Sequence, residues 1–286
     1  MKKILKGFGI ALMLLAVSIY GYLAYTTAKN NAAPAAEAMA AMQSDAAVTV
    51  TMDDWLVMQP ARVTPTTGIV FYAGAYCDVR GYAPMLKEVA AAGYLIVAPT
   101  MPFDFSIFAP DIADEVRAAY PEIDQWIISG HSMGGAMAGR YAFLNQDNLA
   151  GLVVFDSYPP ATHSLADSDL PMLLFERARA DGSQDQKFID NANLYPEGTP
   201  KVLIPGGQHM YYGSFDGGSY EEAWEPGIKR SVQQRIVIEA VIEGLDRLTS
   251  RLNGEEPAIE GQDEPDNMID DLPEETNVII SDQEAA

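Results

Sequence analysis

Residues 126–138, WIISGHSMGGAMA, constrain the fold more than any other part of this chain. A short apolar run leads into the pattern G-x-S-x-G, and small residues typical of a closely packed helix follow it. A strand that passes into a helix through such a turn holds the serine, Ser132, in a strained conformation with its hydroxyl projecting from the sheet. Gly130 and Gly134 leave room for the turn, because a β-carbon at either position would collide with a neighbouring element. An ordinary turn rich in serine and glycine is the alternative, but the predicted strand before it and the predicted helix after it favour the strained strand-to-helix turn.

Apolar runs alternate with helical stretches between residues 48 and 253. This alternation predicts an α/β fold with a mainly parallel, doubly wound sheet covered by helices on both faces. Besides the strand before Ser132, we expect strands at 49–58, 68–73, 94–98, 151–155, 171–175 and 201–204, and helices at 82–92, 111–119, 135–144, 186–194 and 231–252. Ligand sites in such sheets lie beyond the carboxyl ends of the strands, which is where Ser132 is expected.

An apolar N-terminal segment differs from the rest of the chain. Three lysines precede residues 7–25, which carry no charge. Nineteen such residues fit a membrane-spanning helix, which needs about 20, better than the core of a cleaved signal peptide. We therefore assign residues 1–28 to a single-pass anchor, with a signal peptide cleaved near Ala33 as the alternative. The positive flank predicts a cytoplasmic N-terminus, a cell-membrane location and a domain outside the cytoplasm.

The remaining divisions follow from composition. Alanine-rich residues 29–46 are interpreted as a tether, residues 47–252 as the folded domain and residues 253–286 as a disordered acidic tail. The tail contains twelve Asp and Glu residues and no Lys or Arg, so the net charge of −22 falls to −10 without it. This acidity argues against nucleic acid as a partner. The tail could recruit a protein partner, and residues 277–280 could be a short docking segment.

A serine hydroxyl needs a neighbouring general base to act as a nucleophile at neutral pH. The chain has three histidines. His131 adjoins Ser132 and would point to the opposite side of the turn, and His163 lies in a polar loop. His209 follows the last predicted strand within glycine-rich residues 206–213, so we expect His209 to face Ser132.

A histidine base is oriented by a carboxylate, and two aspartates follow predicted strands. Asp181 precedes Gly182 in a turn after the strand ending at Phe175, and Asp156 directly follows residues 151–155. Both preserve the chain order Ser, Asp, His. We favour Asp181, with Asp156 as the alternative and Asp185 as a third candidate.

A tetrahedral intermediate needs backbone donors for its negative oxygen. We expect the N–H groups of Met133, after the serine, and Ala75, after the strand at 68–73, to supply them. The neighbouring Cys77 is interpreted as a packed small residue. The sequence shows neither a glycine-rich phosphate loop nor a metal-spaced His/Cys/Glu cluster, so we expect no cofactor and no metal.

Three segments in this order resemble the α/β-hydrolase superfamily, in particular its compact branch. They are F-Y-x-G at 71–74, G-H-S-M-G-G at 130–135 and G-G-x-H-x-x-x-G at 206–213. The resemblance covers residues 48–250 and implies hydrolysis of carboxylic esters through an acyl-serine intermediate. It departs at Glu176, where a glycine is usual before the acid, and at Gln208, where asparagine is common.

The sequence therefore predicts a membrane-anchored serine hydrolase outside the cytoplasm that cleaves small acyl esters. A lipase, thioesterase or peptidase on the same residues, or an inactive binding module, is the alternative. The loop at 157–170 is too short for a large lid. Five apolar side chains are candidates for an acyl pocket, or for the core: Met101, Phe103, Phe105, Ile107 and Phe108.

Overall fold

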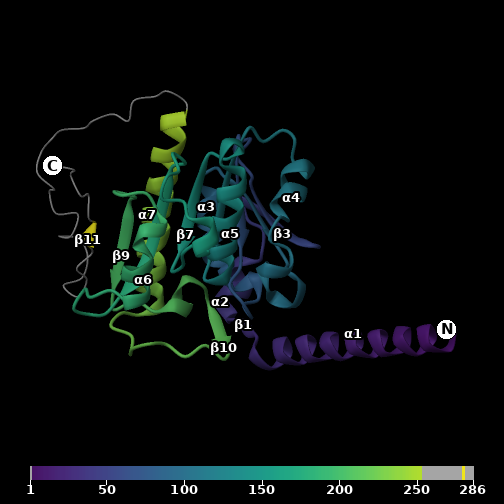
Figure 1. The fold of residues 1–286 in the computed structure, drawn as a ribbon. Helices are drawn as coiled ribbons and strands as arrows, with labels where there is room; N and C mark the ends of the chain where they lie inside the picture. Colours follow the sequence, from purple (N-terminus) through teal and green to yellow (C-terminus); the bar gives the residue numbers. More distant parts are fainter. Residues whose placement is uncertain (1, 253–278, 281–286) are drawn as a thin grey trace, which may run out of the picture.

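The central sheet has the strand order β11-β9-β8-β7-β6-β4-β5-β3-β2 (Figure 1). The computed structural model describes residues 2–252 and 279–280, so most of the predicted acidic tail, and its predicted disorder, lie outside the described residues. Strands β4 to β9 are parallel to one another, whereas β2, β3 and β11 pair antiparallel. The strands are β2 (Val48–Met52), β3 (Trp55–Pro60), β4 (Thr67–Tyr72), β5 (Leu95–Pro99), β6 (Gln125–His131), β7 (Gly151–Phe155), β8 (Met172–Ala178), β9 (Lys201–Pro205) and β11 (Ile279–Ile280).

Helices cover both faces of this sheet, as the alternation of elements predicts. Helices α3 (Ala83–Ala91) and α7 (Arg230–Leu252) pack on one face, and α4 (Ala113–Ala119) and α5 (Met133–Asn145) pack on the other. Successive side chains of a strand point to opposite faces. In β6, Ile127 accordingly lies in the first core and Ile128 in the second. The fully buried strands β4, β5 and β7 explain the continuous apolar runs in the sequence.

The predicted elements are confirmed with small shifts at their ends, and one shift matters for the site. Strand β8 continues three residues past its predicted end at Phe175, through Glu176 and Arg177 to Ala178. A short helix, α6 (Gln186–Asn191), follows it. The segment at 157–170 contains only the single-turn helix η5 (Ala161–His163), so no large lid covers the sheet from this loop.

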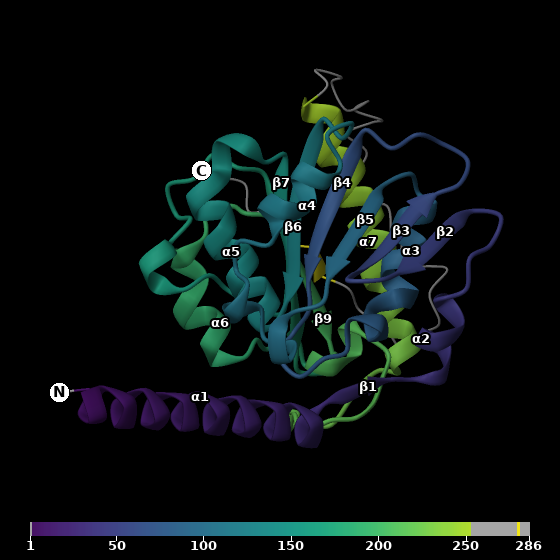
Figure 2. The ribbon, with the colours of Figure 1, turned by 90° about the vertical axis from the view of Figure 1, so that its right-hand side faces the viewer.

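Helix α1 (Lys2–Asn30) projects from the domain in both ribbon views (Figures 1 and 2). Its segment Phe8–Asn30 is long and apolar enough to cross a membrane, by length and composition. Large apolar side chains along it are exposed, for example Phe8 at 68% and Met13 at 63%. From Leu23 onward the helix becomes partly buried, because its end lies against the domain.

The predicted tether at 29–46 is not a free linker. Strand β1 (Ala32–Pro34) pairs antiparallel with β10 (Phe215–Gly217), and helix α2 (Ala36–Ala41) follows it. Ala32, Ala35 and Ala38 are at most 2% exposed. The composition suggested a linker, but alanine is apolar and a strong helix former, so it also suits a closely packed segment. The folded domain therefore begins directly after α1.

Candidate active site

The turn between β6 and α5 has the strained geometry expected from the sequence. Ser132 has φ 54° and ψ −124°, a backbone conformation that non-glycine residues rarely adopt. A β-carbon at Gly134 would lie 2.0 Å from the carbonyl oxygen of Tyr72, and one at Gly130 would lie 2.5 Å from the backbone of Gly134. Only glycine fits at these two positions, so the sequence enforces the turn that lifts Ser132 above the strand ends.

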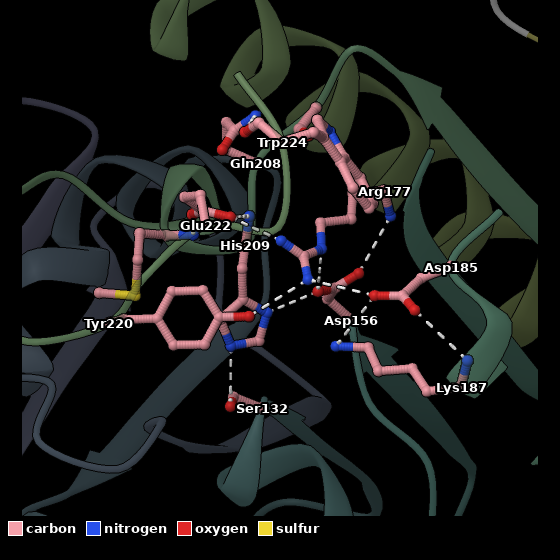
Figure 3. Close-up of polar contacts among 12 residues, drawn as sticks. Ser132, Asp156, Arg177, Asp185, Lys187, Gln208, His209, Tyr220, Glu222 and Trp224 are labelled. Atoms are coloured by element: carbon pink, nitrogen blue, oxygen red, sulfur yellow. Dashed lines mark hydrogen bonds and ion pairs between the residues drawn. The ribbon is translucent and has the colours of Figure 1, made fainter. Parts of the chain in front are cut away.

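His209 lies beside Ser132 at the same edge of the sheet (Figure 3). It begins the single-turn helix η7 (His209–Tyr212) just after β9, and Gly206, with φ 73°, turns the chain between them. The Nε2 atom of His209 is 2.9 Å from the Oγ atom of Ser132. This contact is the one expected between a serine and its general base.

The carboxylate that meets His209 belongs to Asp156, so the preference for Asp181 was wrong. The Oδ2 atom of Asp156 is 2.5 Å from Nδ1 of His209 (Figure 3). Asp181 is exposed in the turn after β8, where its carboxylate accepts hydrogen bonds from the backbone N–H and the hydroxyl of Ser183. The extra length of β8 carries Asp181 beyond the site, whereas β7 ends next to β6 and delivers Asp156 directly.

Asp156 is fully buried and remains the charged partner of the histidine. Burial alone raises the pKa of Asp156, but the hydrogen bond and charge of His209 and the charge of Arg177 outweigh it and hold that pKa below its ordinary value. The Nε atom of Arg177 forms an ion pair with Oδ2 of Asp156 at 3.1 Å, and the backbone N–H of Arg177 donates to Oδ1 at 3.0 Å. The arrangement therefore presents an ionised carboxylate to the imidazole.

Three residues that surround His209 and Asp156 were not predicted from the sequence. Arg177, which is 1% exposed, donates from Nη1 to Glu222 at 2.6 Å and from Nη2 to Tyr220 at 3.2 Å (Figure 3). Glu222 accepts the backbone N–H groups of His209 and Met210 at 3.0 and 2.8 Å. The ring of Tyr220 stacks on His209 with centroids 4.3 Å apart.

Glu222 and Tyr220 contact His209 directly, and Arg177 links both of them to Asp156. Arg177 lies on the unexpected extension of β8, and the other two lie in an irregular loop between β10 and α7, for which the sequence has no periodic signal. The guanidinium of Arg177 also lies over the ring of Trp224 at 4.6 Å. The only sequence signal for Arg177 is a charged residue directly after an apolar run.

Neither of the other two histidines contacts the hydroxyl of Ser132, but His131 does not point away from the site as predicted: its ring packs on the ring of His209, with centroids 4.4 Å apart. His131 is fully buried, and its Nδ1 atom is 2.7 Å from the hydroxyl of Tyr82, which accepts a hydrogen bond from the backbone of Gly74. Burial first, and then the nearby charge of His209, keeps the pKa of His131 well below its ordinary value, so its ring is neutral. His163 packs against Phe143 at the surface.

A pocket of about 420 Å³ opens above Ser132 and His209. Its other walls are Asn30, Ala32, Ala75, Tyr76, Cys77, His131, Met210, Ser219, Tyr220 and Glu221. The five predicted apolar candidates do not line it; Met101 is buried in the core, whereas Ile107 and Phe108 are exposed. Burial raises the pKa of the Cys77 thiol to about 12, so Cys77 is an unreactive, packed residue.

The two backbone N–H groups predicted to stabilise an oxyanion are those of Ala75 and Met133. The N–H groups of Ala75 and Met133 donate no hydrogen bond to the part of the chain that the structure describes. Ala75 lines the pocket with Ser132, and Met133 directly follows the serine at the N-terminus of α5. Within the described residues, no group of three or more His, Cys, Asp or Glu side chains could hold a metal ion.

Fold and site together define an α/β protein with a hydrogen-bonded serine, histidine and aspartate at the carboxyl edge of a parallel sheet. Residues 68–223 match the alpha/beta hydrolase family, and the chain belongs to that family.

Comparisons with known proteins agree with this assignment. The pimeloyl-(acyl-carrier protein) methyl ester esterase of Photorhabdus laumondii subsp. laumondii is 44% identical over 61 residues, which cover 21% of this chain and only 22% of that protein. The predicted CIB-like hydrolase of Thermoplasma acidophilum superposes with a TM-score of 0.52 at 13% identity, over 68% of this chain and 99% of the other. Est1E of Butyrivibrio proteoclasticus gives 0.51 at 12% identity, over 71% and 99%. At these identities the two structures support the fold alone.

Proposed function

We propose that the protein is a serine hydrolase that cleaves carboxylic esters through an acyl-serine intermediate. The observation that carries the proposal is the continuous contact from Ser132 through His209 to the buried Asp156, at the floor of an open pocket. Hydrolase chemistry agrees with the family, and an ester substrate agrees with the name of the partial relative, a methyl ester esterase.

The reaction follows from the geometry of these side chains. Nε2 of His209 takes the hydroxyl proton as Oγ of Ser132 attacks the acyl carbon, and Asp156 stabilises the imidazolium that forms. The backbone N–H groups of Met133 and Ala75 donate to the negative oxygen of the tetrahedral intermediate. His209 returns the proton to the leaving alcohol, and water then releases the acid from Ser132 by the same route.

Labelling with a fluorophosphonate probe tests the proposal. The wild-type protein should form a covalent adduct, and the Ser132→Ala and His209→Ala variants should not. His163→Ala is the matched control, because His163 packs on Phe143 and does not line the pocket that contains Ser132, and it should label like the wild type. If the folded wild-type protein does not react, or if Ser132→Ala reacts equally well, the proposed mechanism is wrong.

We also propose that α1 anchors the protein in the cell membrane, with the N-terminus in the cytoplasm and the domain outside. Supporting features are the lysines in the first turns of the helix, its exposed apolar side chains and the tyrosines 20, 22 and 25 near its far end. The expected result is an uncleaved N-terminus on a protein that stays with the membrane fraction in alkaline carbonate. A mature N-terminus near Ala33 would contradict this arrangement.

A further inference from the structure

The end of helix α1 is part of the pocket rather than a distant attachment. Its last residue, Asn30, and the following Ala32 both line the pocket above Ser132. The hydroxyl of Thr27 donates to the backbone oxygen of Phe103 at 2.8 Å, and the amide of Asn31 donates to Asp104 at 3.1 Å. One residue separates α1 from β1, so little slack remains between the helix and the domain.

This docking sets the level of a membrane surface relative to the pocket. The ring of Tyr20 on α1 contacts the ring of Phe103, with centroids 5.3 Å apart. About 20 helical residues span the hydrocarbon core, and aromatic rings favour its boundary with water. Residues 7–25 form the apolar part of the helix and Tyr20 lies toward its far end, so the proposed anchor would bring Phe103 close to the outer membrane interface.

A row of aromatic rings leads from that level to the pocket. Phe108 contacts Phe103 and Phe105 at centroid distances of 6.0 and 5.9 Å, and Phe105 contacts Tyr76 at 4.7 Å. Tyr76 is itself a wall of the pocket that contains Ser132. Phe108 is 50% exposed and its neighbour Ile107 is 54% exposed, an apolar tip beside the helix.

The backbone of this row is held in a strained shape. Tyr76, Phe103 and Asp104 have φ values of 58°, 56° and 58°, and the backbone N–H of Tyr76 donates to the carbonyl of Asp104 at 3.1 Å. Such conformations persist only where the surrounding contacts enforce them, and here Thr27 of α1 and the two residues after the helix, Asn31 and Ala32, supply contacts to Phe103, Asp104 and Tyr76.

We infer that the protein takes its substrate from the membrane in which it is anchored: a long-chain carboxylic ester dissolved in the outer leaflet, which reaches Ser132 past Ile107 and Phe108. This inference rests on the proposed function. The anchor places the pocket mouth at the lipid surface, and the exposed apolar tip contacts the lipid there. The ester group moves from the lipid surface along the row of aromatic rings to Ser132, while the acyl chain remains in contact with the lipid and the aromatic rings and does not enter water.

The test compares two esters on full-length protein reconstituted in phosphatidylcholine vesicles. The first, 4-nitrophenyl palmitate, resides in the vesicle membrane, and the second, 4-nitrophenyl acetate, is soluble in water. The double variant Ile107→Ser/Phe108→Ser removes the apolar tip without changing a pocket wall. Leu144→Ser is the matched control, since Leu144 is 50% exposed at the end of α5 that lies away from Ser132.

The double variant should hydrolyse 4-nitrophenyl palmitate at roughly one tenth of the wild-type rate or less, because two half-exposed apolar side chains no longer enter the lipid. Its rate of hydrolysis of 4-nitrophenyl acetate should remain at the wild-type level, and this activity would also show that the variant is folded. The Leu144→Ser variant should match the wild type with both esters. Because α1 still holds every variant on the vesicle, the loss reports on the loop and not on recruitment.

Two results would overturn the inference while leaving the proposed function intact. In the first, the wild-type protein in vesicles cleaves 4-nitrophenyl acetate but not 4-nitrophenyl palmitate. In the second, the double variant cleaves both esters like the wild type. If the wild type cleaves neither ester and does not react with a fluorophosphonate, the proposed function is refuted, and the inference is refuted with it.

Discussion

Replacing Asp156 with asparagine tests which carboxylate serves the histidine. The Asp156→Asn side chain keeps the size of the aspartate but loses the charge that faces Nδ1 of His209. Two unit charges about 4 Å apart interact by about 4 kcal/mol at an effective dielectric of about 20. Each 1.36 kcal/mol changes a rate about tenfold, so kcat should fall by roughly a thousandfold.

The assay is kcat and KM for a water-soluble ester, measured beside the rate of fluorophosphonate labelling. Asp181→Asn is the matched control, because Asp181 is exposed and contacts only its own turn; it should retain wild-type rates. Arg177 keeps its contact with Glu222 in the Asp156→Asn variant, and a thermal melt will show that the protein is folded. Wild-type activity in Asp156→Asn, or a large loss in Asp181→Asn, would refute the assignment.

Three further predictions follow from other contacts in the structure. Glu222→Ala removes the acceptor of the backbone N–H groups of His209 and Met210, so kcat should fall by about 10- to 100-fold, whereas Glu225→Ala, at an exposed position of the same loop that does not line the pocket, should change kcat little. His131 has a lowered pKa in the folded protein, so the unfolded chain binds an extra proton at this residue below about pH 6.5. Acidification from pH 7 to 5 should therefore lower the free energy of unfolding by about 2 kcal/mol through this group. Denaturant titrations of the His131→Gln variant should not show this part of the loss. A protein that begins at residue 45 lacks β1 and α2 and should melt at a lower temperature than one that begins at residue 30; equal melting temperatures would show that this segment is not part of the fold.

The order and type of most elements could be predicted because their signals are local. Buried parallel strands read as apolar runs, and the spacing of Gly130, Ser132 and Gly134 specifies a sharp turn within five residues. His209 could be selected because it is the one histidine placed in a glycine-rich turn after a strand. These features determined the fold class and two members of the candidate site.

The N-terminal segment shows where composition is ambiguous. An alanine-rich stretch suits both a linker and a packed strand and helix, and only a partner decides between them. That partner, β10, lies about 180 residues away in sequence, in a region with no periodic pattern. The sequence therefore predicted the helix α1 but not its docking beside Ser132.

The third member of the site was decided by tertiary structure. Asp156 and Asp181 both follow strands in the order the chemistry requires, so the sequence left two candidates. The choice depends on how far each strand extends and on which strand lies beside β6: β7 ends level with Ser132, and β8 runs three residues longer than predicted. That extension carries Asp181 past the site and brings Arg177 into it. A sequence specifies which side chains are available, but only the alignment of neighbouring strands brings residues 132, 156 and 209 within hydrogen-bond distance.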